Sequence, residues 1–180
     1  MRAALPSLAL ALLCLLRARA EVPVQPDFDA EKFAGMWHVT ATASNCSIFL
    51  KMKDGMKSST AIISFTPEGD LAMKLVWPLL DKCQNFELLF QRSGQAGHYT
   101  GMCGQGAQEK RDLLVMETDY SHYAVLHEAQ NSEMEPSTAL QLLTREQDVS
   151  PQLLQEFVEL IPTMGLTEDM LAILPKSGEC

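Results

Sequence analysis

The chain has 180 residues, of which 47% are hydrophobic, and it carries 23 acidic against 14 basic residues for a formal net charge of −9. This length suits one domain with a single core. Because an acidic chain without a basic stripe repels phosphate backbones, we expect no nucleic-acid partner.

Residues 1–20 predict a secretory signal peptide. An almost uninterrupted apolar run spans Leu5–Leu16, and small residues at Ala18 and Ala20 form a cleavage site. The run is shorter than the ~20 residues of a membrane-spanning helix, and no later stretch is long and apolar enough to span. We therefore expect a secreted, extracellular protein with a mature domain of residues 21–180. Cleavage removes three arginines and no acid, which leaves a net charge of −12.

The next part of the chain predicts eight short strands separated by turn signals. The predicted strands are Met36–Ala43, Ser59–Phe65, Asp70–Trp77, Asn85–Gln91, His98–Cys103, Arg111–Thr118, Tyr123–Glu128 and Thr138–Thr144. Turn-forming residues stand between them, as in Thr66–Asp70 and Gly94–Gly97, and a polar run covers Gln130–Ser137. Eight strands at spacings of about ten residues favour a meandering all-β barrel or sandwich.

Alternation along the strands predicts which side chains share a face. If Trp37 points inward, the period of two places Val39 and Ala41 on the inside as well, and it groups Met73 with Leu75. An eight-stranded barrel is just wide enough to be filled by side chains or to hold one small ligand. The period alone leaves both possibilities open.

One amphipathic helix is predicted after the last strand. Ser150 suits the N-cap, Pro151 suits the first helical position, and Pro162 ends the helix. Apolar residues recur at spacings of three to four residues, at Leu153, Leu154, Phe157, Val158 and Ile161. We expect this stripe to pack on the outside of the barrel, and a helix that binds a partner is the alternative.

Three short motifs occur in a fixed order along these elements. Gly35–Trp37 begins the first strand, Thr118–Tyr120 follows the sixth, and Arg145 follows the eighth. Together with the signal peptide and the eight strands, they resemble the signature regions of the lipocalin family over the whole mature chain. The resemblance implies an all-β fold: an eight-stranded antiparallel up-and-down β-barrel with one C-terminal α-helix packed outside.

In such a barrel the first and eighth strands are neighbours, so we expect Trp37 and Arg145 to meet at its closed end. A guanidinium over an indole face gains on the order of 1 kcal/mol. The alternative is an ordinary core tryptophan and a surface arginine. Asp119, in the turn, is expected to accept hydrogen bonds from neighbouring backbone amides.

Four cysteines remain after the signal peptide, namely Cys46, Cys83, Cys103 and Cys180. In an oxidising compartment they allow three full pairings, between which the residues alone do not choose. No two of them stand at metal-ligand spacing, so we expect no metal site. The family resemblance implies that Cys83 and Cys180 are bonded and tie the C-terminal tail to the barrel wall.

Cys46 and Cys103 are then left to bond each other, to bond a partner chain or to stay free. A family member of the complement system bonds a partner chain through a cysteine that matches Cys46. Asn45 begins an N-glycosylation sequon with Cys46 and Ser47, and a glycan there would crowd an interchain bond.

The enzymes of the family isomerise a prostaglandin with a cysteine thiolate on the second strand. The matching position is Ser59, and a serine hydroxyl without an adjacent base is not nucleophilic at neutral pH. The hydroxyls that assist those enzymes match Val39, Leu75 and Leu143. The four histidines form no metal-spaced pair, and no phosphate-binding glycine loop is present. We therefore expect neither catalysis nor a cofactor.

Apolar side chains at inward positions predict binding instead, because burying apolar surface of a ligand gains roughly 25 cal/mol per Å². The predicted ligand-lining residues are Trp37, Val39, Ser59, Ala61, Ile63, Met73, Leu75, Phe86, Leu88 and Leu143. The alternative is that they fill the barrel as core. The predicted function is binding and transport of one small hydrophobic ligand, and the alternative is an extracellular subunit or scavenger attached through Cys46.

Overall fold

A computed structural model describes residues 21–103, 109–132 and 135–178 of the chain. The predicted signal peptide and Cys180 lie outside the described residues. In the described part of the chain, no helix combines the length and the apolarity that a membrane span requires.

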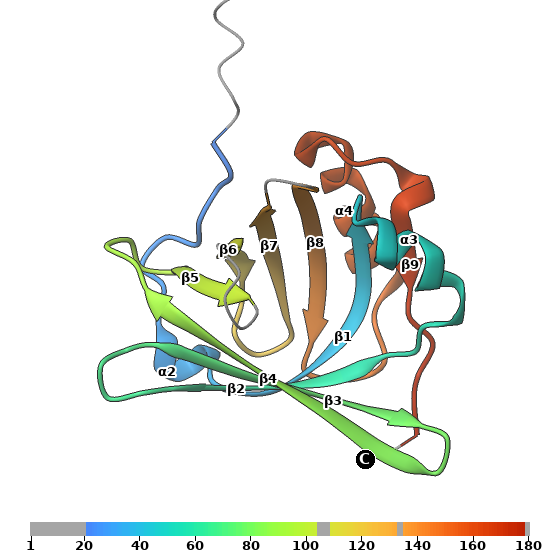
Figure 1. Ribbon diagram of the computed structural model, residues 1–180, viewed down its shortest axis with the longest axis horizontal. Helices are drawn as coiled ribbons and strands as arrows, with labels where there is room; N and C mark the ends of the chain where they lie inside the picture. Colours follow the sequence, from blue (N-terminus) through green and yellow to red (C-terminus); the bar gives the residue numbers. More distant parts are fainter. Residues whose placement is uncertain (1–20, 104–108, 133–134, 179–180) are drawn as a thin grey trace, which may run out of the picture.

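Nine strands in the described residues form one antiparallel sheet that closes into a barrel (Figure 1). They are β1 (Gly35–Ser44), β2 (Ser59–Phe65), β3 (Leu71–Leu79), β4 (Lys82–Arg92), β5 (His98–Cys103), β6 (Glu109–Thr118), β7 (Tyr123–Asn131), β8 (Ser137–Thr144) and β9 (Leu171–Ile173). Each strand from β2 to β8 pairs with the next, and β1 pairs with both β2 and β8. The predicted eight-stranded up-and-down barrel is confirmed, with β9 added outside the ring of eight.

Strand β1 closes the barrel, and it contains a β-bulge. Gly35–Val39 pairs with β2, His38–Ser44 pairs with β8 on the other side, and Ala41–Ala43 also pairs with β9. The register with β8 shifts between Val39 and Ala41, so that the extra residue, Thr40, reverses the alternation. Val39 belongs to the core inside the barrel, whereas Ala41 packs in the cluster beneath the C-terminal helix. The prediction that Ala41 points inward is therefore wrong.

The helices lie at the ends and on the outside of the barrel (Figure 1). They are α2 (Ala30–Phe33), α3 (Ser47–Met52), α4 (Pro151–Leu160) and the 3-10 turns η1 (Lys53–Gly55), η2 (Pro162–Met164) and η3 (Glu168–Met170). Helix α4 begins as predicted, because the Ser150 hydroxyl accepts a hydrogen bond from the Leu153 amide and Pro151 takes the first helical position.

The apolar stripe of α4 packs against the outer wall of the barrel. Phe157 and Ile161 are fully buried in one cluster with Val125, Leu140 and Leu142. These strand residues point away from the interior, since they alternate with residues of the internal core. The helix therefore covers the barrel, as predicted.

The β3–β4 hairpin is longer than predicted and reaches beyond the ring (Figure 1). These two strands stay paired as far as Leu79 and Lys82. Strand β4, by contrast, pairs with β5 only over Phe90–Arg92. Strands β4 and β5 therefore separate between Phe90 and the hairpin tip, and the barrel opens at that end.

Candidate functional site

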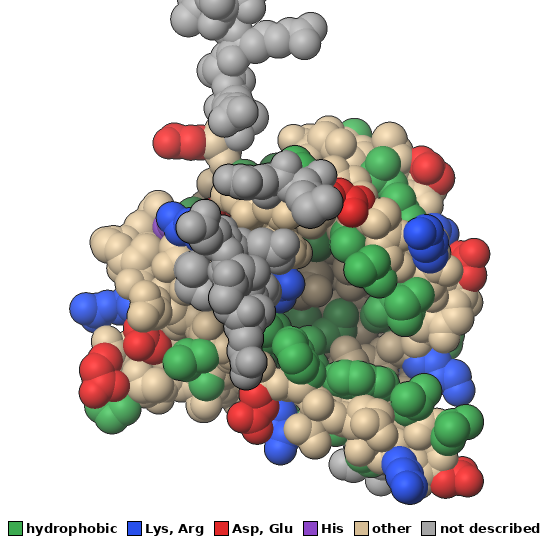
Figure 2. Space-filling view, in the orientation of Figure 1, with side chains coloured by type: hydrophobic (Ala, Val, Ile, Leu, Met, Phe, Trp, Pro, Cys, Tyr) green, Lys and Arg blue, Asp and Glu red, His purple; other side chains and the backbone are tan. Residues whose placement is uncertain are grey.

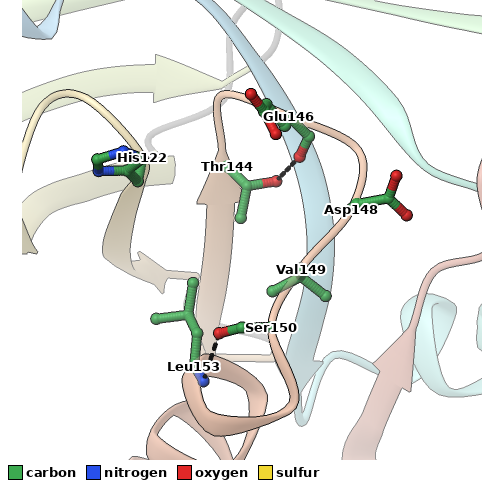
Figure 3. A pocket seen from close by; sticks show the side chains of 7 residues that line it. All are labelled: His122, Thr144, Glu146, Asp148, Val149, Ser150 and Leu153. Carbon is green, nitrogen blue, oxygen red and sulfur yellow. Dashed lines mark hydrogen bonds between the residues drawn. The ribbon is translucent and has the colours of Figure 1, made fainter.

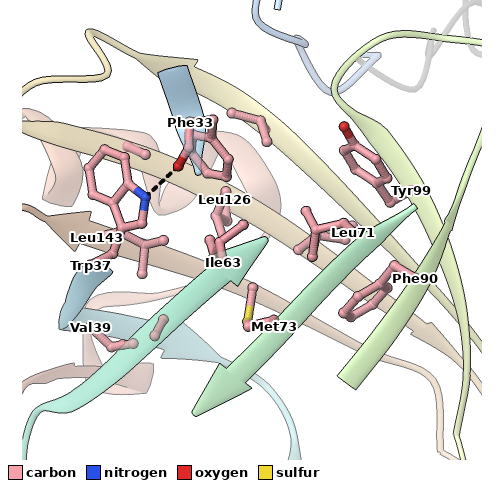
Figure 4. Packing of buried hydrophobic residues seen from close by; sticks show 14 of the residues in the cluster. Phe33, Trp37, Val39, Ile63, Leu71, Met73, Phe90, Tyr99, Leu126 and Leu143 are labelled. Atoms are coloured by element: carbon pink, nitrogen blue, oxygen red, sulfur yellow. Dashed lines mark hydrogen bonds between the residues drawn. The ribbon is translucent and has the colours of Figure 1, made fainter. Parts of the chain in front are cut away.

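The closed end of the barrel is filled by its own side chains, which we call the floor (Figure 4). Eight large side chains of the floor are each at most 1% exposed. They are Phe33, Trp37, Ile63, Leu71, Phe90, Leu113, Leu126 and Leu143. At this exposure the floor has the character of a packed core rather than of a binding surface.

Arg145 packs against Trp37 on the outer side of the floor. The guanidinium carbon lies 3.7 Å from the centroid of the indole ring, within the range of a cation–π contact. The indole N–H donates to the backbone carbonyl of Phe33 at 2.9 Å. Arg145 also donates hydrogen bonds to four backbone carbonyls, those of Lys32, Ala34, Met36 and Tyr120. The arginine thus joins α2, β1 and the turn after β6 at one point.

The first position of β1 requires a glycine, Gly35. Its φ of +109° is a conformation that side chains rarely adopt. A Cβ at this position would also stand 3.1 Å from Nη1 of Arg145. The glycine of the first motif therefore makes room for the arginine of the third.

The turn after β6 is held by Asp119. Its Oδ1 accepts hydrogen bonds from the backbone amides of Ser121, His122 and Tyr123. Burial raises the pKa of Asp119, but the hydrogen bonds from Tyr123 and His122 outweigh it and leave the pKa below the usual value. Thr118 fastens the same turn, because its hydroxyl donates to the carbonyl of Tyr123 at 2.7 Å.

The other end of the barrel is open, and we call its interior the cup. Figure 2 shows a hollow there with hydrophobic side chains on its walls. Leu75 and Leu88 face inward, since each stands two residues along its strand from a residue of the internal core, Met73 or Phe90. Both nevertheless remain partly exposed. Phe86, opposite Leu75, is 55% exposed. Inward side chains that keep contact with solvent indicate space above the floor.

The structure divides the ten predicted ligand-lining residues between these two regions. Trp37, Ala61, Ile63 and Leu143 are buried in or just above the floor. Val39 and Met73, at 5% and 6% exposure, mark the boundary. Ser59, Leu75, Phe86 and Leu88 belong to the cup. The barrel is therefore packed at its closed end, whereas inward side chains near the open end stay partly exposed, and ligand contact by these residues stays a prediction.

The sequence analysis did not predict a charged pair on the wall of the cup formed by β6 and β7. Nε of Arg111 on β6 lies 2.9 Å from Oε1 of Glu128 on β7, and each side chain is 19% exposed. Both face inward, because each stands two residues along its strand from a residue of the internal core, Leu113 or Leu126. Burial raises the pKa of Glu128, and the charge of Arg111 opposes that rise. Extending the alternation from Leu113 and Leu126 would have found this pair.

Two grooves lie outside the barrel. The first, of about 260 Å³, lies between the end of β8 and the start of α4 (Figure 3). Its lining includes Thr144 and Ser150, whose hydroxyl groups are engaged with the Glu146 carbonyl and the Leu153 amide. The second, of about 430 Å³, lies over β2, β3 and β4. The first groove shares no residue with the cup, whereas the lining of the second includes Met73 and Leu88.

The position of the family's catalytic cysteine, Ser59, lies at the start of β2 opposite Val39. In the described residues, histidine side-chain hydrogen bonds join His98 to Asp112 and His122 to Asp119, and none reaches the Ser59 hydroxyl group. The described residues also contain no cluster of three or more histidine, cysteine, aspartate or glutamate side chains that could hold a metal ion.

The cysteines occupy different surroundings. Cys83 on β4 is disulfide-bonded. Its expected partner, Cys180, and the side chain of Cys103 lie outside the described parts of the chain, so the pairing stays a prediction. Cys46 is half-buried and unpaired among the described residues. The neighbouring Asn45 is exposed, and its side-chain carbonyl accepts a hydrogen bond from the amide of Thr138 at 2.8 Å.

Comparison with known protein families gives one match over most of the chain. The model of the "Lipocalin / cytosolic fatty-acid binding protein family" matches residues 34–178. This range begins one residue before Gly35 and includes every strand of the barrel and α4.

Several known proteins are similar to the chain. Lipocalin-15 of Homo sapiens is 42% identical, with 95% of this chain and 91% of that protein covered. The extracellular fatty acid-binding protein of Coturnix japonica is 34% identical, with 100% and 97% covered. The prostaglandin-H2 D-isomerase of Sus scrofa is 28% identical, with 95% and 90% covered.

One solved structure resembles the fold closely. It is described as "The Siderocalin Ex-FABP functions through dual ligand specificities", and it aligns with a TM-score of 0.71 at 30% identity. The alignment covers 83% of this chain and 97% of that chain. The similar proteins thus include both ligand binders and an enzyme by name, so similarity alone does not decide between binding and catalysis.

Proposed function

This chain belongs to the lipocalin / cytosolic fatty-acid binding protein family, and we propose that it is a secreted protein that binds and transports a small hydrophobic ligand in its cup without transforming it. The observation that carries the proposal is the division of the barrel interior. A packed floor closes one end, whereas apolar side chains at the other end face inward and remain partly exposed.

The energy for binding comes from the apolar wall of the cup. Leu75, Phe86 and Leu88 stand side by side on β3 and β4. Covering such side chains with a ligand removes apolar surface from water at roughly 25 cal/mol per Å². Because the floor is already packed, the ligand is expected to reach no deeper than Val39 and Met73.

Secretion is supported by the similar proteins and by residues 1–20. Two of the similar proteins, from Coturnix japonica and Gallus gallus, are named as extracellular fatty acid-binding proteins. Residues 1–20, which contain the apolar run Leu5–Leu16, have the composition of a cleaved signal peptide.

The absence of catalysis is the part of the proposal that depends on single residues. Ser59 stands where the family's isomerases have a thiol, and Val39, Leu75 and Leu143 stand where they have assisting hydroxyl groups. A hydroxyl group needs a neighbouring base to act as a nucleophile. None of the described contacts gives Ser59 such a base.

Titration of the secreted protein with a lipophilic fluorophore tests the binding proposal. We expect saturable binding with an affinity in the micromolar range, about −8 kcal/mol. Leu75→Glu places an unpaired charge in the cup and should weaken binding at least tenfold. Ile62→Glu is the matched control, because Ile62 lies on the neighbouring strand but on the outer face and is 44% exposed. Equal affinities of both variants would overturn the proposed site.

Incubation with a prostaglandin endoperoxide tests the catalytic question. We expect no turnover above the uncatalysed rate by the natural sequence. Ser59→Cys restores the thiol, and isomerase activity in that variant alone would show that the pocket still accepts a prostanoid. Turnover by the natural sequence would overturn the non-catalytic part of the proposal.

A subunit joined to a partner through Cys46 is the alternative function, and it predicts a different mass. The intact mass of the secreted protein, with and without reductant and glycosidase, separates the cases. We expect a monomer with a glycan at Asn45, which is exposed. A second chain released by reductant would support the alternative.

A further inference from the structure

Two neighbouring connections at the open end of the barrel expose hydrophobic side chains to solvent. Strands β1 and β3 both run from the floor to the open end, so the β1–β2 connection, with α3 and η1, and the β3–β4 turn both lie there. Both stand on the right-hand side of the view in Figure 1. We call these two connections, residues 47–57 and 79–82, the rim. Four large hydrophobic side chains of the rim are more than half exposed, namely Ile48, Met52, Leu79 and Leu80.

Leu80 occupies a position of the turn that does not suit a leucine. Because Leu79 pairs with Lys82, the residues between them form a two-residue hairpin turn. The first residue of such a turn has a positive φ and is most often glycine, asparagine or aspartate. Leu80 has a φ of +53°, which strains a residue with a side chain, and at 93% exposure it makes little compensating contact. A strained and exposed leucine indicates a role outside the fold itself.

Helix α3 also turns apolar side chains toward solvent. Ile48 and Met52 are four residues apart, so they lie on the same face of the helix, and both are exposed. Phe49, by contrast, packs against the internal core and attaches the helix to the barrel. The exposed face of α3 is therefore held in place while its two large side chains stay free to contact another surface.

The charge of the rim is opposite to that of the whole chain. Four lysines against two aspartates give the rim a net charge of +2, whereas the chain has a formal net charge of −9. In the described residues, only Lys53 of these lysines has an ion-pair partner, Asp54. Figure 2 shows basic side chains beside hydrophobic ones on the right-hand side of the hollow. Exposed apolar side chains among positive charges favour contact with the surface of an anionic membrane.

We propose that the rim docks the protein on the surface of an anionic phospholipid bilayer. The hydrophobic side chains of α3 and of the β3–β4 turn insert at the boundary between head groups and acyl chains, while Lys51, Lys57 and Lys82 lie at the lipid phosphates. The proposal goes beyond the proposed function, because it concerns the outer surface of the open end and not the ligand site. It places the mouth of the cup against the bilayer.

Two acidic residues at the open end indicate how the protein would be tilted on the bilayer. Glu109 begins β6, and Glu135 precedes β8. Anionic lipid would repel both carboxylates. Glu135 accepts hydrogen bonds from the amide and the hydroxyl group of Ser47, at 3.3 and 3.0 Å, and so lies at the N-terminal end of α3, whereas Lys51 lies near its C-terminal end. We therefore expect the side formed by the C-terminal part of α3 and the β3–β4 turn to contact the lipid.

Sedimentation of the secreted protein with vesicles tests the proposal. We expect binding to phosphatidylglycerol vesicles, and binding at least about tenfold weaker to zwitterionic phosphatidylcholine vesicles. Added salt should weaken binding to the anionic vesicles, because it screens the lysines. Trp77, partly exposed near the turn on β3, supplies a second measurement, since its fluorescence should shift to shorter wavelength when the bilayer covers it.

Leu80→Gly separates docking from folding. Glycine removes the apolar side chain and also relieves the strain at positive φ. We expect binding to phosphatidylglycerol vesicles to weaken about tenfold, whereas the midpoint of urea unfolding should be at least as high as that of the natural sequence. Leu89→Ala is the matched control, because Leu89 is also exposed but lies on the outer face of β4, away from the rim. It should leave vesicle binding unchanged.

Lys82→Gln tests the contribution of charge. Loss of one lysine at the lipid surface should weaken binding to phosphatidylglycerol vesicles about fivefold. Lys74→Gln is the matched control, because it removes the same charge from the outer face of β3, opposite Ile62. It should change vesicle binding less than about twofold.

The remaining outcomes would overturn the docking site. One is the absence of binding to phosphatidylglycerol vesicles, and another is binding that neither Leu80→Gly nor Lys82→Gln weakens. A lower unfolding midpoint in Leu80→Gly would show that the leucine serves the fold. A dimer without vesicle binding, seen by sedimentation velocity and lost in Leu80→Gly, would show that the rim contacts a second copy of the chain instead. Each of these results leaves the proposed function intact, because the fluorophore titration without vesicles decides that separately.

Discussion

Along β6 and β7, the inward positions change from fully buried at one end to partly exposed at the other. Leu113 and Leu126 are at most 1% exposed, whereas Arg111 and Glu128, the next inward positions, are each 19% exposed. The same alternation therefore supplies both the packed floor and the wall of the cup. What separates the two regions is whether β4 and β5 are paired at that level of the barrel.

At the floor β4 and β5 are paired. Phe90 lies opposite Gly101, where a Cβ would stand 2.8 Å from the phenylalanine ring. Nearer the open end β4 leaves β5 and continues with β3. The comparison teaches that floor residues should control stability and cup residues should control affinity. The following predictions test that separation.

The largest effect is expected for Trp37→Ala in the floor. The indole ring is fully buried and bonded to Phe33, so its removal should lower the free energy of unfolding by ~3–5 kcal/mol. Urea unfolding of the two proteins measures the difference. Trp77→Ala, on the partly exposed continuation of β3, is the control and should cost far less. A near-neutral Trp37→Ala would show that the closed end is not the stabilising region.

A matched pair of leucine variants sharpens the comparison. Leu143→Ala in the floor should cost ~2–5 kcal/mol of stability, because Leu143 is 1% exposed. Leu88→Ala in the cup should cost about 1 kcal/mol or less, since part of that side chain is already in water. Leu88→Ala should weaken fluorophore binding more than Leu143→Ala does. Equal effects of the two variants on both quantities would abolish the distinction between floor and cup.

Arg145→Ala should have the third largest effect. It removes the contact with Trp37 and four hydrogen bonds to backbone carbonyls, although water can reach some of these carbonyls. We expect a loss of about 2 kcal/mol of stability and little change in ligand affinity. Arg145→Lys keeps the charge but not the planar fork, so it should recover less than half of the loss. Full recovery by lysine would mean that charge alone matters here.

The sequence predicted those features of this barrel that depend on local pattern. Strand β2 lies where the alternation of Ser59–Phe65 placed it, and α4 begins at the predicted cap of Ser150 and Pro151. The three motifs placed Trp37 and Arg145 together because neighbouring strands must meet in a closed barrel. Each of these features follows from residues close in sequence or from closure itself.

The features that were missed depend on long-range geometry. The bulge at Thr40 adds one residue to β1 without a distinctive residue type, and β9 has three residues, too few for an alternation to show. The pair Arg111 and Glu128 was missed because the predicted lining, apart from Ser59, consists of apolar residues. The boundary between floor and cup depends on where β4 leaves β5, which no single strand encodes.

The smallest effect is expected at the turn that supports the floor from outside. Asp119→Asn keeps an acceptor for the amides of Ser121, His122 and Tyr123 but removes the charge, so it should cost about 1 kcal/mol at neutral pH. The folded state holds the pKa of Asp119 below its unfolded value of 3.8, so the carboxylate stabilises the fold above that pH and loses its contribution as the pH falls further. The stability difference between the two proteins should therefore shrink below about pH 4, as urea unfolding at several pH values would measure. Because this turn lies at the closed end, fluorophore affinity should stay the same throughout. A variant that binds more weakly while equally stable would show that the closed end also shapes the cup.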